Sequence, residues 1–285
     1  MSVSIKIGVI GAGTMGNGIA HVFSLYGNDI ILVDMNDEII NSALSTIHKN
    51  MERQYRKDVI TEERMEKSYN NIIGTTNLEK LSDCHLVIEA VKEDYKIKSD
   101  LFQKLDRICN QNTILASNTS SISINDLAKN ISRSDKFIGM HFMNPVPVMK
   151  LVEIIKGDNT SKETLHSIKE LTKSIDKISV ECNDSPGFVS NRILMPMINE
   201  AAFCYMEGVA EVDAIDSIMK LGMGHPMGPL KLADLIGIDV CVYIMNVLYE
   251  GFKDEKYKVC PLLEKMVSKN QLGKKTKEGF YKYEF

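Results

Sequence analysis

The sequence lacks the long apolar and strongly basic stretches that mark several classes of protein. No run reaches roughly eighteen apolar residues, the length that suggests a membrane span, so we expect no membrane partner. The net charge of −4 gives no reason to expect nucleic acid as a partner. The first apolar run begins at Ile5. It leaves no room for a targeting peptide, and this favours the cytoplasm.

The cysteine pattern also lacks the usual metal and redox motifs. The six cysteines are widely spread, none of them forms CxxC, and the six histidines are scattered. Zinc sites need close pairs of such ligands. We therefore expect no metal, and we expect the cysteines to be free thiols that are mostly buried.

Proline is absent from the first half of the chain, because all seven prolines follow residue 144. Short β-rich runs alternate there with helical patterns. The runs are IKIGVI (5–10), DIILV (29–33), HLVIEA (85–90), TILAS (113–117), FIGMH (137–141), LVEII (151–155) and a short one near 178–180. This alternation predicts an α/β fold with a mostly parallel sheet that helices cover on both faces.

Two departures from the alternation define the domain plan. The helical stretch 37–70 is interrupted at DVITEER, where Thr61 is a plausible N-cap, so we expect an inserted helical hairpin. After Asp184 the patterns are helical only, with one helix expected from Pro186 and three more over 211–270. We therefore predict one domain at 1–184 and a smaller all-α domain at 185–285.

The segment GVIGAGTMGNG (8–18) follows the first strand and opens a helix. Gly11, Gly13 and Gly16 have the GxGxxG spacing of a dinucleotide site. The first permits a tight turn, the second a close approach of pyrophosphate, and the third close packing of helix on strand. Asp34, at the end of the second strand, could be a helix-start residue. With the glycines it predicts a Rossmann-type domain that prefers NAD to NADP, because a carboxylate repels a 2′-phosphate.

A basic helix face has two possible interpretations. Lys49, Arg53 and Lys57 recur at four-residue spacing and share one side of the expected helix. Taken alone, such charges most often form a solvated surface. The alternative is a site for a polyanionic substrate handle, such as the phosphates of coenzyme A.

Polar residues follow two of the expected strands. Residues 118–121, in ILASNTSSIS, could cap the next helix or hydrogen-bond a substrate oxygen. His141 ends the next strand, and Glu153 interrupts the apolar run after it. The two could be a satisfied structural pair, or a catalytic base with the carboxylate that orients it.

Long motifs give a resemblance to a known family. They are IGAGTMGNGIA, VIEAVKED, ILASNTSSISI, IGMHFMNPVPVMKLVEII, DSPGFVSNRILMPMINEA, HPMGPLKLADLIG and GKKTKEGFYKY. With these motifs in order, the chain resembles the 3-hydroxyacyl-CoA dehydrogenases essentially end to end, and most of all their bacterial 3-hydroxybutyryl-CoA members. DSPGFVSNR is especially specific to that family.

The resemblance implies a role for individual residues. His141 would be the general acid/base with Glu153 as its partner, and Ser120 and Asn191 would contact the substrate oxygen at C3. Arg53 and Lys57 would bind coenzyme A. The positions matching cofactor contacts are Gly11, Gly13, Thr14, Met15, Gly16, Asp34, Glu93, Lys98, Asn144 and Lys275.

The implied activity is NAD-dependent interconversion of (S)-3-hydroxyacyl-CoA and 3-ketoacyl-CoA, with short acyl chains favoured. The implied assembly is a homodimer through residues 188–285. Two alternatives remain, a related β-hydroxyacid dehydrogenase that acts on a free acid and a dinucleotide-binding structural protein. The basic helix face argues against the first. His141 with Glu153, Ser120 and Asn191 argues against the second.

Overall fold

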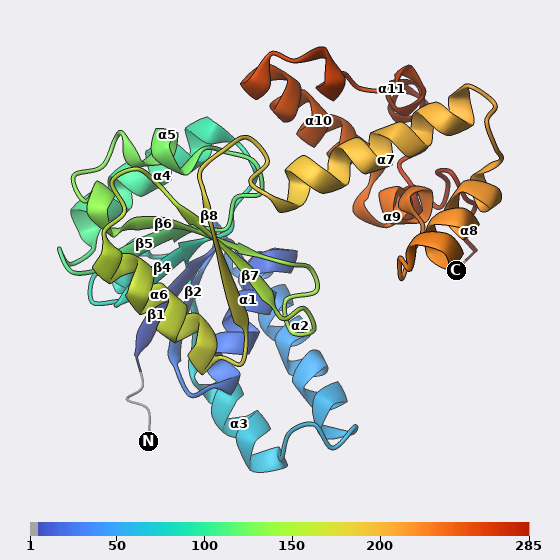
Figure 1. The fold of residues 1–285 in the computed structure, drawn as a ribbon. Coiled ribbons are helices and arrows are strands. Elements are labelled where there is room, and N and C mark those ends of the chain that lie inside the picture. The colour runs from blue at the N-terminus through green and yellow to red at the C-terminus, as the bar shows by residue number, and fades with distance from the viewer. Residues whose placement is uncertain (1–4, 285) are drawn as a thin grey trace. The chain divides into compact units, whose positions relative to one another are not determined.

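The computed structural model describes residues 5–284, which separate into two compact units, the first ending at Asp184 and the second beginning at Ser185 (Figure 1). Within these residues the first unit holds an eight-stranded sheet in the order β3-β2-β1-β4-β5-β6-β7-β8. All neighbouring strands are parallel except β6 and β7. The predicted α/β class with a mostly parallel sheet is confirmed.

The elements of the first unit alternate along the chain as expected. The strands are β1 Lys6–Ile10, β2 Asp29–Val33, β3 Ile72–Thr75, β4 Leu86–Glu89, β5 Ile114–Ser117, β6 Phe137–Phe142, β7 Leu151–Lys156 and β8 Ile178–Asn183. The α-helices are α1 Thr14–Leu25, α2 Asp37–Tyr55, α3 Glu62–Asn70, α4 Tyr95–Ile108, α5 Ile124–Ala128 and α6 Lys162–Ser174.

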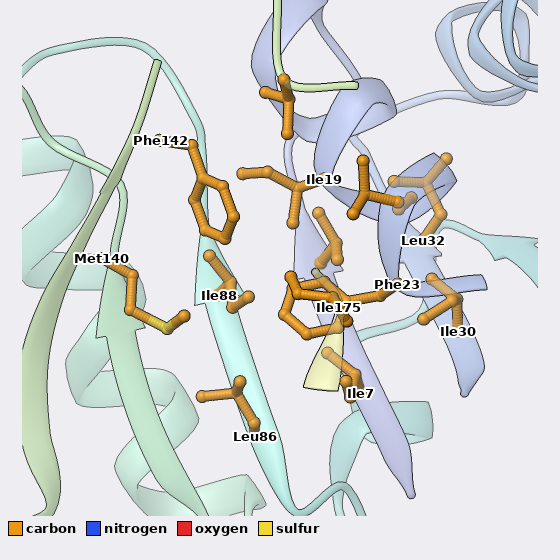
Figure 2. Packing of buried hydrophobic residues seen from close by; sticks show 14 of the residues in the cluster. Ile7, Ile19, Phe23, Ile30, Leu32, Leu86, Ile88, Met140, Phe142 and Ile175 are labelled. Carbon is orange, nitrogen blue, oxygen red and sulfur yellow. The ribbon is translucent and has the colours of Figure 1, made fainter. Parts of the chain in front are cut away.

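One face of the sheet packs against α1, α2 and α6 in a continuous apolar core (Figure 2). Phe23 of α1 meets Phe142 of β6 edge to face, with ring centroids 6.2 Å apart. Met140 and Phe142 both belong to this core. Because successive side chains of a strand alternate between faces, His141 points to the opposite face of the sheet.

The predicted helical hairpin is present as α2 and α3. Asn36 caps the start of α2, because its Oδ1 accepts a hydrogen bond from the amide of Ile39 at 2.9 Å. Thr61 caps α3, as predicted, and accepts from the amide of Arg64 at 3.2 Å. These side chains satisfy amides at helix starts that have no partner within the helix.

The predictions missed one strand and misplaced the start of one helix. Strand β3, whose four residues IIGT lie at the edge of the sheet, was not predicted. Helix α7 begins at Ser190 instead of Pro186. Gly187 and Phe188 have φ of 71° and 52°, and a right-handed helix cannot include such residues.

The second unit is helical. Its α-helices are α7 Ser190–Met206, α8 Val212–Met223, α9 Pro229–Ile236, α10 Ile238–Phe252 and α11 Pro261–Ser268. Residues 211–270 thus form four α-helices where three were expected. Gly237 separates α9 from α10 with φ of 107°, a conformation that glycine adopts readily.

No single helix in the described part of the chain is long and apolar enough to cross a membrane. Helices α9 and α10 would pass that test of length and composition only together, and they are bent by 98° at the break between them.

His21 is a buried histidine in α1 that none of the motifs explains. Its side chain is 1% exposed, and Nε2 lies 3.2 Å from Oε1 of Gln54 in α2. That oxygen can only accept, so Nε2 carries the proton and Nδ1 is the acceptor. Nδ1 is buried without a hydrogen-bond donor among residues 5–284. Burial lowers the pKa of His21 from 6.5 to about 4.

We predict that His21 makes the protein less stable as the pH falls from 6.5 to about 4. The unfolded chain binds a proton there that the folded chain excludes, and 2.5 pKa units correspond to about 3 kcal/mol. His21→Leu should lose less unfolding free energy than the wild type over that interval. His166→Leu, at an exposed histidine of α6, is the control. Equal pH dependence in wild type and His21→Leu would contradict the prediction.

Candidate active site

The glycine-rich loop between β1 and α1 has the geometry that its spacing predicts. Gly11 has φ of 95°, and a Cβ there would lie 2.5 Å from the carbonyl oxygen of Ala90. A Cβ on Gly16 would lie 1.6 Å from the carbonyl oxygen of Gly11, so these positions accept only glycine. A Cβ on Gly13 would meet nothing within 4 Å. The loop is therefore tight on its inner side and open at Gly13, where α1 begins.

The start of α1 is suited to bind phosphate. Thr14 and Met15 are its first residues, Gly13 is the N-cap, and no side chain caps the helix. Its first turn holds no acidic residue. Amides at such a helix start, together with the helix dipole, favour an anion.

Asp34 lies against the same loop. Its Oδ2 accepts a hydrogen bond from the amide of Ala12 at 2.6 Å, and its Oδ1 accepts from the amide of Met35 at 2.6 Å. Beside the loop is a cavity of about 390 Å³ that residues of α2 line on its other side. Open backbone at Gly13, an uncapped helix start and a carboxylate after β2 fit the pyrophosphate and adenosine ribose of a dinucleotide.

Glu93 holds the segment that carries Ser120 by several hydrogen bonds. Its Oε1 accepts from the Thr119 hydroxyl at 2.5 Å and from the Ser121 hydroxyl at 2.9 Å. The amides of Ser120 and Ser121 donate to the same oxygen at 3.0 and 3.1 Å, and the Ser120 hydroxyl is 3.3 Å away. The carboxylate thus fixes the backbone on both sides of the Ser120 side chain.

Lys98 links Glu93 to a second carboxylate. Its Nζ lies 3.2 Å from Glu93 Oε2 and 2.5 Å from Glu89 Oε1, and both Lys98 and Glu89 are fully buried. Burial raises the pKa of Glu89. The pKa of Glu93 is lowered, because Lys98 and the Thr119 and Ser121 hydroxyls outweigh its own burial. Sequence reasoning missed Glu89, although a glutamate that ends the apolar strand HLVIEA was a signal.

His141 and Glu153 are directly opposite each other in the antiparallel pairing of β6 with β7. His141 Nδ1 lies 3.0 Å from Glu153 Oε2, and the two residues are 8% and 4% exposed. A carboxylate at Nδ1 favours the tautomer that carries its proton there and stabilises the imidazolium form. The structure therefore brings together the two residues that the sequence proposed as a pair.

Two contacts beside this pair were not predicted. Asn118 Oδ1 accepts a hydrogen bond from the amide of Phe142 at 2.9 Å, which joins the end of β5 to the residue after His141. The Cys182 thiol of β8 lies 3.9 Å from Glu153 Oε1, a weak contact. Both depend on strand neighbours that a single sequence does not reveal.

The remaining predicted residues lie elsewhere in the fold. Asn144 is exposed in the loop between β6 and β7. Asn191 and Lys275 belong to the second unit, where Asn191 is a buried residue of the first turn of α7. The Lys275 ammonium bonds Asp239 at 2.6 Å. The roles of these three residues stay predictions.

Arg53 is exposed in the last turn of α2, and Lys57 is exposed two residues beyond the end of that helix at Tyr55, so the predicted basic helix face does not extend to Lys57. Glu52, the neighbouring carboxylate, lies near Arg56 at 3.9 Å and near His48 at 3.7 Å. The nearest carboxylate on the helix therefore pairs with other residues, and the role of Arg53 and Lys57 also stays a prediction.

Among residues 5–284 no group of three or more His, Cys, Asp or Glu side chains could hold a metal ion. The six cysteines, all within residues 5–284, form no disulfide. Burial raises the pKa of both Cys84 and Cys241 to about 12, so neither thiol ionises near neutral pH.

The fold and the loop geometry define a dinucleotide-binding α/β protein with a helical second unit. Family models then match nearly the whole chain. The 3-hydroxyacyl-CoA dehydrogenase NAD-binding domain matches residues 6–185, and the C-terminal domain of the same family matches residues 187–283. The chain therefore belongs to the 3-hydroxyacyl-CoA dehydrogenase family and is an oxidoreductase with NAD as its cofactor.

Individual relatives agree with this assignment. The chain is 52% identical over 279 residues to a probable 3-hydroxybutyryl-CoA dehydrogenase of Deinococcus radiodurans, covering 98% of this chain and 100% of that protein. It is 52% identical to the 3-hydroxybutyryl-CoA dehydrogenase of Clostridioides difficile, covering 98% and 99%. The crystal structure of (S)-3-hydroxybutyryl-CoA dehydrogenase from Ralstonia eutropha matches with a TM-score of 0.96 and 44% identity, covering 99% and 100%.

Proposed function

We propose that this protein interconverts (S)-3-hydroxyacyl-CoA and 3-ketoacyl-CoA, with 3-hydroxybutyryl-CoA and acetoacetyl-CoA as its main substrates. The observation that carries the proposal is the contact between His141 and Glu153, 3.0 Å long and located at the carboxyl edge of an NAD-binding sheet. Substrate sites of open α/β sheets lie outside this edge. The names of the relatives that match this chain over nearly its full length support the short-chain substrate.

NAD, when bound, supplies the hydride acceptor for oxidation and, as NADH, the hydride donor for reduction. The glycine loop and Asp34 would hold its pyrophosphate and adenosine ribose. The other parts of the cofactor would be contacted by Glu93, Lys98, Asn144 and Lys275.

The chain itself supplies proton transfer and orientation. In oxidation His141 Nε2 takes the proton of the 3-hydroxyl as hydride leaves C3, and in reduction it returns a proton to that oxygen. Glu153 stabilises the imidazolium that oxidation creates. Ser120 and Asn191 hydrogen-bond the C3 oxygen and hold it toward His141. Ser120 can do so from a fixed backbone, because Glu93 holds the amides of Ser120 and Ser121.

We predict that His141→Gln lowers kcat for acetoacetyl-CoA reduction by about 10²–10⁴-fold, the usual contribution of a positioned acid/base. NADH binding should persist, because the glycine loop is unchanged. Turnover is followed by the loss of NADH absorbance, and binding by NADH fluorescence. His166→Gln, at an exposed histidine, is the matched control. Wild-type turnover by His141→Gln would refute the catalytic role, and a wild type inactive on acetoacetyl-CoA would refute the substrate.

The basic residues Arg53 and Lys57 are proposed to bind the phosphates of coenzyme A. Replacing both with Gln should raise KM for acetoacetyl-CoA by about three- to tenfold, as expected for two exposed ion pairs of about 0.3–0.7 kcal/mol each. The difference should shrink at high salt and vanish with a pantetheine ester that has no nucleotide.

A double variant on α4, Lys104→Gln with Arg107→Gln, is the matched control, because it removes the same charges from two exposed positions. An equal rise in KM for both double variants would mean that the change in net charge alone causes the effect. An unchanged KM at Arg53 and Lys57 would restore the interpretation of a solvated surface.

We also propose that the protein is a homodimer through residues 188–285. Large apolar side chains are exposed on the second unit, among them Ile218 at 60%, Leu221 at 87% and Met223 at 64% on α8. Exposed apolar surface of this kind is typical of interaction sites. We predict that the wild type sediments as a dimer and that Leu221→Asp shifts it toward monomer. A wild-type monomer at micromolar concentration would contradict the proposal.

A further inference from the structure

Lys177, between α6 and β8, is a buried lysine that no motif explains. The residue is 7% exposed, and its Nζ donates to the carbonyl oxygens of Val146 at 2.7 Å and of Met149 at 2.6 Å. Burial, followed by the charge of Lys150, lowers the pKa of Lys177. A buried ammonium is unfavourable unless acceptors surround it. The two carbonyl groups therefore stabilise the buried ammonium group of Lys177.

Both acceptors lie in a single loop, residues 143–150, which joins β6 to β7. The loop thus connects the strand of His141 to the strand of Glu153. Within the loop, the amides of Val148 and Met149 both donate to the carbonyl oxygen of Pro145, so the loop also has a compact turn of its own.

The loop is held on its other side by α1. Val146 is 2% exposed, and a Cβ added to Gly18 would lie 2.9 Å from the Cβ of Val146. Gly18 is in the helix that begins at the glycine-rich loop. The loop therefore lies between the cofactor-binding helix and Lys177, and a shift at either side moves the residues between them.

Asn144 stands at the start of this loop, two residues before Val146. We propose that Lys177 is a positioning residue for the cofactor, holding loop 143–150 so that Asn144 meets the nicotinamide half of NAD. This inference rests on the proposed role of Asn144. Lys177 acts only through the loop and does not touch substrate or cofactor.

The test replaces Lys177 with Met, which keeps the length of the side chain and removes its donors. Lys177→Met should weaken NADH binding about tenfold, which corresponds to about 1.4 kcal/mol. NADH fluorescence titration gives this value without turnover. In steady state the same rise should appear in KM for NADH, while KM for acetoacetyl-CoA stays near that of the wild type.

Lys173→Met is the matched control. Lys173 is an exposed lysine in the last turn of α6, four residues before Lys177 and outside loop 143–150. The variant removes a neighbouring positive charge and leaves the loop carbonyls bonded. We expect its NADH affinity to equal that of the wild type. An equal loss in Lys173→Met and Lys177→Met would overturn the proposal, because charge alone would then explain it.

A double-mutant cycle tests the route through the loop. In an Asn144→Ala background, Lys177→Met should have little further effect on NADH affinity. Additive losses would overturn the proposal. If Lys177→Met does not fold, Lys177→Gln, which can still donate to one carbonyl, should show a smaller loss in the same direction. Unchanged NADH affinity in a folded variant would also overturn it.

The result for Lys177 can be distinguished from the result for the proposed function. Wild-type turnover of acetoacetyl-CoA decides the substrate. The NADH titrations decide the role of Lys177 whether or not acetoacetyl-CoA is turned over.

Discussion

The antiparallel pairing of β6 with β7 is the constraint on which the candidate chemistry depends. It places His141 opposite Glu153 and, one residue to either side, sets Met140 opposite Ile154 and Phe142 opposite Val152. Those four apolar side chains belong to the core on the α1 face. A slip of β7 by one residue would turn Glu153 into that core and Val152 and Ile154 out of it. The apolar residues therefore fix the register that brings the imidazole and the carboxylate together.

A buried polar network fixes the neighbouring strand ends in a different way. Glu89, at the end of β4, and Glu93, after it, share the ammonium group of Lys98, and Glu93 orders the segment around Ser120. Removing one member would leave a buried charge without its partner, which is far less favourable than keeping the whole set. Asn118 extends the order to β6 through the amide of Phe142. Hydrogen bonds, not apolar packing, thus hold this part of the site.

The sequence predicted what local patterns determine. The glycine loop, the strands with long apolar runs and the Thr61 cap each depend on neighbours within a few residues. Strand β3 was missed because four edge residues give little periodicity, and the start of α7 because the positive φ of Phe188 has no sequence signal. Glu153 was assigned to His141 because a carboxylate in an apolar run needs a partner. The bonds of Lys177 join residues 28 and 31 positions apart, so only the folded structure reveals them.

The hairpin of β6 and β7 also has a consequence for chain entropy. His141 and Glu153 are 12 residues apart, whereas Lys98 reaches the serine segment through Glu93, whose bonds to that segment span 26 to 28 residues. The entropy lost on closing a flexible loop grows with its length. The contact between His141 and Glu153 therefore closes a shorter stretch of chain than the bonds from Glu93 to the serine segment, and its closure restricts the chain less. Its geometry depends on one short loop and two strands, whereas the order around Ser120 requires a whole strand–helix–strand crossover to be in place.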